Sequence, residues 1–257
     1  MPVEWNQYLQ LPEGTLQNQR IPKTVLAARA NLSKKEEKAL ANLHELRNYA
    51  LVGKSNTGIL PRVDDTYDIQ TVIYLDCTLA SWDKAGELAT ILHRVFPNPT
   101  VLLMRTMNPL EGRMLSVAAK RKSLAETGAV VVENMDVTGV LDPMDAATAT
   151  FWNAIRYDRL PQTDLLDYVH GMQDAILFHR LQPQLGFMPK PNLMHRAEIR
   201  SELDRLKRLD AEISRLLAKR RDKDTTFGES TEIRVLESGK KEEAQTIVDH
   251  IKELCHD

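Results

Sequence analysis

EGRMLSVAAKRKSLAETGAVVVENMDVTGVL, residues 111–141, places two apolar extended segments on either side of the basic tripeptide Lys120-Arg121-Lys122. The first segment covers 114–120, the second covers 129–133, and a Thr-Gly pair between them is a turn signal. We therefore expect strands in the middle of the chain, with a cationic turn or strand end beside them. The stretch contains no recognisable catalytic constellation.

Apolar residues rich in β-branched types also predict strands over 69–79 and 100–106, and a short amphipathic helix separates these two segments. Asp83 is the expected N-cap of that helix, which ends before Pro97. The order strand, helix and three strands favours a mixed sheet over a strict βαβ series. The predicted fold class is α+β, with a central sheet of about four strands covered by helices and followed by a C-terminal helical, coiled-coil-like hairpin.

Further helices are expected before and after the sheet region in the sequence. Ser33 and Glu36 form a capping box, in which a hydroxyl and a carboxylate each satisfy a free backbone N–H group. The apolar residues that follow recur near a 3.6 period and predict a helix over 34–49. Two more helices are predicted over 146–157 and 164–181.

A proline-rich connector follows these helices. Three prolines from Pro183 onward, with a glycine among them, form a stiff segment in which a helix cannot continue. We place a domain boundary there, between an α+β domain over 1–185 and a helical hairpin over 186–257. The hairpin is a candidate element for docking or oligomerisation.

Beyond the connector, apolar residues recur at steps of three, four and seven, the spacing of a coiled-coil seam in which Asp210 occupies one core position. The first helix has a basic excess and the second an acidic excess, which favours an antiparallel hairpin. The hairpin can equally exchange partners between two chains. The residues predicted to dock a partner are Ile199, Leu203, Leu206, Ile213, Leu217, Ile247, Ile251 and Leu254.

The composition indicates a cellular compartment but no reaction and no partner. The 257 residues include 34 basic and 36 acidic ones, so net charge predicts no partner. Two cysteines, Cys77 and Cys255, are too few for a disulfide framework and indicate a reducing compartment. No apolar run is long enough for a bilayer, so we expect a cytoplasmic protein with no membrane association.

The sequence contains two partial catalytic motifs, and each lacks a residue that its chemistry requires. Gly53-Lys54-Ser55 resembles the end of a phosphate-binding loop, but Asn48 stands where that loop needs a glycine, and the predicted context is a preceding helix rather than a strand. Asp76 and neighbouring acids could hold magnesium beside Lys120, although Ala118 stands where a nuclease would carry an acid. We expect no catalytic residues, no metal and no cofactor, with a metal-dependent nuclease-like subunit as the alternative.

Two basic clusters are candidates for nucleic-acid contact, because lysine and arginine can neutralise backbone phosphates. Aromatic residues make up only 5% of the chain and none is interleaved with either cluster, so an ordinary solvated face is the simpler interpretation. The candidate nucleic-acid-binding residues are Lys120, Arg121, Lys122, Lys219, Arg220 and Arg221.

Several separated segments share their order and spacing with one known family. They are Leu11-Pro12-Glu13, Arg20-Ile21-Pro22-Lys23, the helix after Leu32-Ser33, the strand ending near Leu79, Val117-Ala118-Ala119-Lys120-Arg121, Thr138 after the 130–133 strand, and the helix from Ile213 to Phe227. Through these segments the chain resembles the bacterial and archaeal family catalogued as domain of unknown function 4391. The resemblance spans nearly the whole chain and departs from the family pattern over 222–230.

The resemblance implies a setting rather than a reaction. Such proteins look like accessory partners of helicases and DNA methyltransferases in restriction-type or other anti-phage loci. The leading hypothesis is therefore a non-catalytic adaptor that uses its hairpin to dock a larger DNA-processing subunit, with nucleic acid as a further candidate partner. The alternatives are the nuclease-like subunit and a homodimeric scaffold formed through the seam.

Overall fold

The computed structural model describes residues 5–29, 32–108, 110–189, 195–222 and 225–256. The chain divides into two compact units, Met1–Arg180 and Leu181–Asp257, each described here by itself. The boundary between the units lies within helix α7 (Leu165–Leu185).

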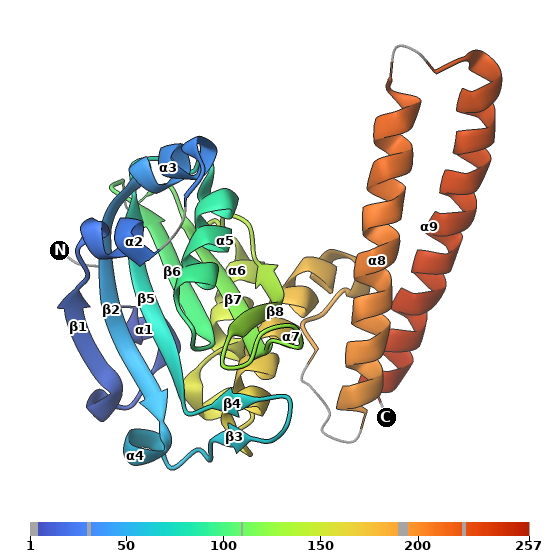
Figure 1. Cartoon of the computed structure of the whole chain (residues 1–257). Coiled ribbons are helices and arrows are strands. Elements are labelled where there is room, and N and C mark those ends of the chain that lie inside the picture. The colour runs from blue at the N-terminus through green and yellow to red at the C-terminus, as the bar shows by residue number, and fades with distance from the viewer. Residues whose placement is uncertain (1–4, 30–31, 109, 190–194, 223–224, 257) are drawn as a thin grey trace. The chain divides into compact units, whose positions relative to one another are not determined.

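The first unit is built on a six-stranded mixed sheet with the order β1-β2-β5-β6-β7-β8 (Figure 1). Neighbours pair antiparallel except β5 and β6, which are parallel and joined by the crossover helix α5 (Ala85–Val95). The mixed α+β prediction is confirmed, with six strands instead of about four. The strands are β1 (Leu16–Arg20), β2 (Leu43–Gly53), β5 (Thr71–Leu79), β6 (Thr100–Thr106), β7 (Arg113–Lys122) and β8 (Val130–Val137), and β3 (Arg62–Val63) and β4 (Asp68–Ile69) form a separate small ribbon.

The predicted helix over 34–49 is wrong in its second half. Its start is confirmed, because Ser33 and Glu36 form the capping box at helix α3 (Lys34–Ala41). The chain then enters β2, whose pairing with β5 contains two bulges. Each bulge inserts one residue, so buried residues of the strand are spaced by three and four instead of two, which imitates a helical period.

Helices cover both faces of the sheet. The helices α2 (Lys23–Arg29), α3 and α5 lie on one face, and α6 (Ala146–Ala154) and α7 lie on the other (Figure 1). Side chains of β5 alternate between these faces. Leu75 and Cys77 belong to the core shared with α5, whereas the Tyr74 hydroxyl lies 2.6 Å from the Tyr168 hydroxyl of α7. The remaining short helices are α1 (Asn6–Leu9), η1 (Glu13–Thr15), α4 (Lys54–Thr57) and η2 (Tyr157–Arg159).

Two helix ends differ from the sequence predictions. The N-cap of α5 is Lys84, in the left-handed conformation, and not Asp83. Helix α7 continues through Pro183 to Leu185 and ends where Gly186, with φ +83°, donates its N–H to the Gln182 carbonyl. A proline in the final turn therefore did not end the helix here.

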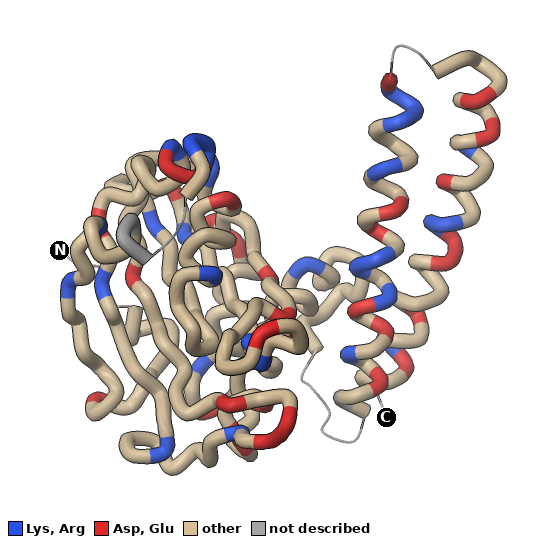
Figure 2. Tube along the Cα trace, viewed as in Figure 1, with Lys and Arg blue, Asp and Glu red and all other residues tan. Residues whose placement is uncertain are grey.

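The second unit contains α8 (Arg196–Arg220) and α9 (Phe227–His256), which run antiparallel and pack along their length (Figure 1). The predicted helical hairpin is confirmed and closes within one chain. Leu209 is buried and Asp210 is exposed, so the predicted core position of Asp210 is wrong. Ion pairs link the helices, including Arg205 with Glu243 at 2.8 Å, and charges of both signs alternate along them (Figure 2).

Candidate functional site

The first predicted basic cluster does not form an exposed patch. Lys120 is only 3% exposed and donates from Nζ to the His93 carbonyl of α5. Lys122 Nζ donates to the Asp64 carbonyl at 2.5 Å, and Arg121 donates to the backbone carbonyl of Lys122. Lys120 is therefore not available to a phosphate, whereas Arg121 and Lys122 are half-buried and each donates to a backbone carbonyl, so phosphate contact stays a prediction for these two residues only.

Lys120 belongs to a buried polar group between β7 and α5. The His93 Nε2 atom lies 2.8 Å from Ser116 Oγ, and both residues are fully buried. Burial lowers the pKa of Lys120 to about 8; burial and, to a smaller extent, the Lys120 charge lower the pKa of His93 to about 3. A serine and a histidine that water cannot reach form a structural contact rather than a reaction centre.

The second basic cluster lies at the loop end of the hairpin and is only partly available. Arg220 pairs with the buried carboxylate of Glu237, which also pairs with Lys241. Lys219 and Arg221 are exposed. These two cations are the members of the cluster that a phosphate could approach.

The predicted partner-docking residues lie in the seam between α8 and α9. Seven of the eight are buried, and Leu217 is half-buried, so they hold the hairpin together instead of facing a partner. We define the hairpin tip as residues 216–222, at the end of α8, together with 225–236, which cover the start of α9 and the two residues before it. It exposes three large apolar side chains: Phe227 at 91%, Val235 at 69% and Leu236 at 58%.

The residues of the nuclease alternative do not converge. Asp76 faces α1 and accepts hydrogen bonds from Trp5 Nε1 at 3.0 Å and from Arg105 at 3.0 and 3.1 Å. Lys120 contacts α5 on the opposite face of the sheet. Within the described ranges, no three His, Cys, Asp or Glu side chains are grouped to hold a metal ion.

Gly53-Lys54-Ser55 follows strand β2, and not a helix as the sequence had indicated. It opens α4, a helix of four residues, and the Gly53 N–H donates to the Asn56 side chain. That backbone donor is therefore already used within the loop.

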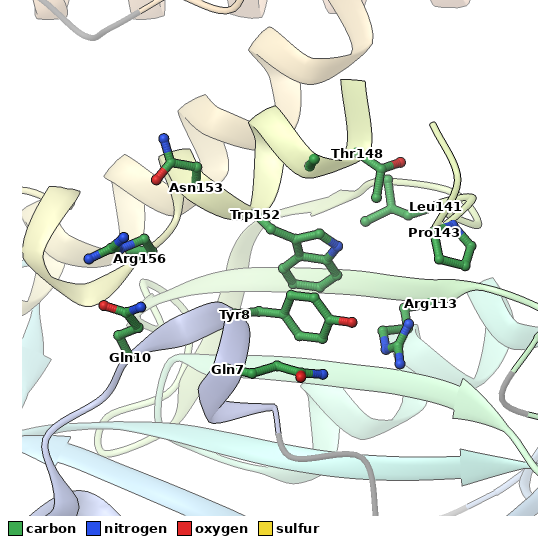
Figure 3. Close-up of a pocket in the computed structure, with 11 residues that line it drawn as sticks. Gln7, Tyr8, Gln10, Arg113, Leu141, Pro143, Thr148, Trp152, Asn153 and Arg156 are labelled. Atoms are coloured by element: carbon green, nitrogen blue, oxygen red, sulfur yellow. The ribbon is translucent and has the colours of Figure 1, made fainter. Parts of the chain in front are cut away.

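A pocket of about 310 Å³ lies beside α1 and α6 in the first unit (Figure 3). Arg113, at the start of β7, places its guanidinium 5.0 Å from the ring of Tyr8 and 5.9 Å from the ring of Trp5. Tyr8 in turn stacks on Trp152 at 4.8 Å. The lining residues are Gln7, Tyr8, Gln10, Arg113, Leu141, Pro143, Thr148, Ala149, Trp152, Asn153 and Arg156.

One backbone feature and one side-chain contact position Arg113. Gly112 has φ +85°, and a Cβ there would lie 2.5 Å from the Leu141 carbonyl oxygen, so only glycine fits this close approach. The backbones of Arg113 and Leu141 then exchange two hydrogen bonds. On the other side, Asp76 holds the indole of Trp5, against which the arginine packs.

Sequence reasoning missed this pocket entirely. Its side chains come from three segments, 7–10, 113 and 141–156, which share no motif or spacing. A sequence signal existed only in the aromatic residues near the N-terminus, Trp5 and Tyr8, for which the sequence predicted no role. The fold brings the segments together through the pairing of β7 and the packing of α1 on α6.

A family model described as "Domain of unknown function (DUF4391)" matches residues 9–236. No curated protein and no solved structure matches the chain. In the part of the chain that the structure describes, no helix has both the length and the apolar character that a membrane span requires.

Proposed function

This chain belongs to the DUF4391 family, and we propose that it is a non-catalytic accessory subunit that docks a larger DNA-processing protein through its hairpin tip. The proposed setting is the bacterial cytoplasm, in an anti-phage or restriction-modification-type system. The proposed partner is a helicase or a DNA methyltransferase.

The exposed apolar side chains of α9 are the observation that carries this proposal. The seam already pairs α8 with α9, so the hairpin needs no second chain to cover its core. Phe227, Val235 and Leu236 nevertheless remain mostly exposed within ten residues of one helix. Large exposed apolar side chains this close together in one surface helix make the start of α9 a candidate protein contact.

The tip exposes charges of both signs, with Lys219 and Arg221 beside the acids Asp222, Glu229 and Glu232. Lys219 and Arg221 are exposed near the end of α8, close in sequence to the start of α9. Such cations speed association with an acidic surface and favour one orientation. They are also the residues through which nucleic acid bound by the partner could be contacted.

The two alternative functions receive less support from the geometry. A scaffold formed by exchanging helices between chains would use the same seam that α8 and α9 fill within one chain. The nuclease-like alternative needs Asp76 and Lys120 around one phosphate, and they lie on opposite faces of the sheet.

Affinity purification of the full-length tagged protein from its own host tests the proposal. Mass spectrometry of proteins retained through a salt wash is expected to identify a helicase or methyltransferase. The double variant Val235→Asp/Leu236→Asp should lose that protein, while Ser214→Asp, at an exposed polar position of α8, should keep it. Equal retention by the two variants would count against docking at the tip.

A further inference from the structure

We propose that the pocket beside α1 and α6 binds a small molecule through a carboxylate or phosphate group held at Arg113. The site lies wholly within the first unit and is independent of the hairpin tip. The charge of Arg113, the hydrogen-bond donors beside it, and the size and lining of the pocket favour such a ligand.

The charge of Arg113 has no counterion among the described residues. Its guanidinium packs on the rings of Tyr8 and Trp5, but no carboxylate pairs with it there, and its Nε atom is buried without a hydrogen-bond acceptor. Aromatic faces stabilise such a cation only in part. A half-buried guanidinium with free donors is a suitable partner for an anionic oxygen group, which can accept two parallel hydrogen bonds from it.

Further donors point toward the same place. Figure 3 shows the hydroxyl of Tyr8 and the indole nitrogen of Trp152 on the side of the pocket where Arg113 lies. Neither group makes a hydrogen bond within the described part of the chain, and the hydroxyl of Thr148 lies on the same wall. Several unsatisfied donors beside one cation fit an acceptor with more than one oxygen atom.

The other basic residue of the pocket is already neutralised. Arg156 makes two hydrogen bonds to Asp158, at 3.1 and 3.2 Å. The anionic group is therefore assigned to Arg113, and the Arg156 end of the pocket is left to a polar, uncharged part of the ligand, near the amide side chains of Gln10 and Asn153.

The volume and the lining of the pocket indicate the class of ligand that it would bind. A volume of about 310 Å³ lies at the small end of the range for ligand sites, which starts near 300 Å³. The rings of Tyr8 and Trp152 lie between the two ends, and Leu141 and Pro143 lie at the Arg113 end (Figure 3). The ligand is thus a compact molecule with an anionic head, an apolar or planar body and a polar tail.

Tryptophan fluorescence of the full-length protein tests the proposal, because Trp152 lines the pocket and Trp5 packs against Arg113. Trp82, whose indole donates to the Glu111 carbonyl, is replaced by Phe in every protein to remove its signal. The probes are inorganic phosphate, adenosine monophosphate and benzoate. A saturable change in fluorescence with inorganic phosphate or adenosine monophosphate, but not with benzoate, identifies phosphate as the head group. A saturable change with benzoate alone identifies carboxylate.

Arg113→Gln should weaken the binding of the responding probe at least about tenfold, since it removes charged hydrogen bonds. Arg113→Lys keeps the positive charge but loses the paired donors of the guanidinium, so its affinity for the probe should lie between those of Arg113→Gln and the wild type. Arg20→Gln, at an exposed arginine of β1 outside the pocket lining, is the matched control and should bind as wild type does. Circular dichroism verifies that each variant is folded. The proposal is overturned if no probe gives a saturable change, or if folded Arg113→Gln binds as tightly as wild type.

Discussion

At the scale of single residues, His93 is an ionisable group that folding removes from water. Its pKa falls from 6.5 to about 3, chiefly because burial disfavours the charged ring. The unfolded chain therefore binds more protons than the folded protein between these values. The contribution of the uncharged His93 ring to the free energy of unfolding is fully present above pH 6.5, and it is lost as the pH falls toward 3.

We expect the free energy of unfolding to fall by about 1.4 kcal/mol per pH unit below pH 6.5 from this single proton. Urea unfolding at several pH values between 6.5 and 4.5 measures the slope. Hydrogen bonds with Ser33 lower the pKa of Glu36 from 4.5 to about 2. The contribution of Glu36 to stability is therefore lost only below pH 4.5, outside the range measured. The variant His93→Gln should flatten the slope and His44→Gln, at an exposed position, should not. Identical slopes in both variants would contradict the assignment.

Asp76 is the second residue whose role can be measured. Its carboxylate accepts three hydrogen bonds from Trp5 and Arg105, and the Arg105 side chain is only 16% exposed. Asp76→Asn should lower the free energy of unfolding by about 3 kcal/mol, because it leaves the arginine without its counterion.

The matched control for Asp76 is Asp158→Asn, which removes an exposed ion pair with Arg156 and should change stability by less than about 1 kcal/mol. Urea denaturation compares the two variants. Similar losses in both would show that burial does not govern the Asp76 pair.

At the scale of elements, the turn into β7 depends on glycine. Gly112 and Gly128 both have φ above +80°, but only Gly112 has the Leu141 carbonyl in the place of a Cβ. Gly128→Ala should cost roughly 1–2 kcal/mol of backbone strain. Gly112→Ala should cost clearly more, because the Leu141 backbone must also move. Thermal and urea unfolding check the order, and an equal cost at the two sites would contradict the close approach.

Sequence periodicity identified most elements, and its failures have physical causes. Strand β6 has the predicted bounds, and the capping box marks the start of α3. Strand β2 was predicted as helix because its bulges spaced the buried residues like those of a helix. In the hairpin, Leu209 rather than Asp210 fills the seam, a choice between adjacent residues that periodicity alone did not resolve.

At the scale of the whole molecule, sites made from distant segments are the ones that sequence reasoning missed. The Arg113 pocket joins the N-terminal α1 to residues more than one hundred positions later. Conversely, Lys120-Arg121-Lys122 are adjacent in sequence, yet the fold directs their side chains at protein acceptors. Local charge density therefore overstated the accessible surface, because Lys120 is buried and Arg121 and Lys122 are half-buried.

Two compact units suggest a division of labour for the proposed accessory subunit. The first unit contains the pocket, and the second presents the hairpin tip with its exposed Phe227, Val235 and Leu236. A partner docked on the tip would bury these side chains and slow the opening of the first turns of α9.

Hydrogen–deuterium exchange of the full-length protein, alone and in the complex recovered from its host, tests docking at the tip most directly. The account predicts new protection of backbone amides over 227–236, with little change over the strands of the sheet. Protection confined to the first unit, with 227–236 exchanging as in the free protein, would contradict it.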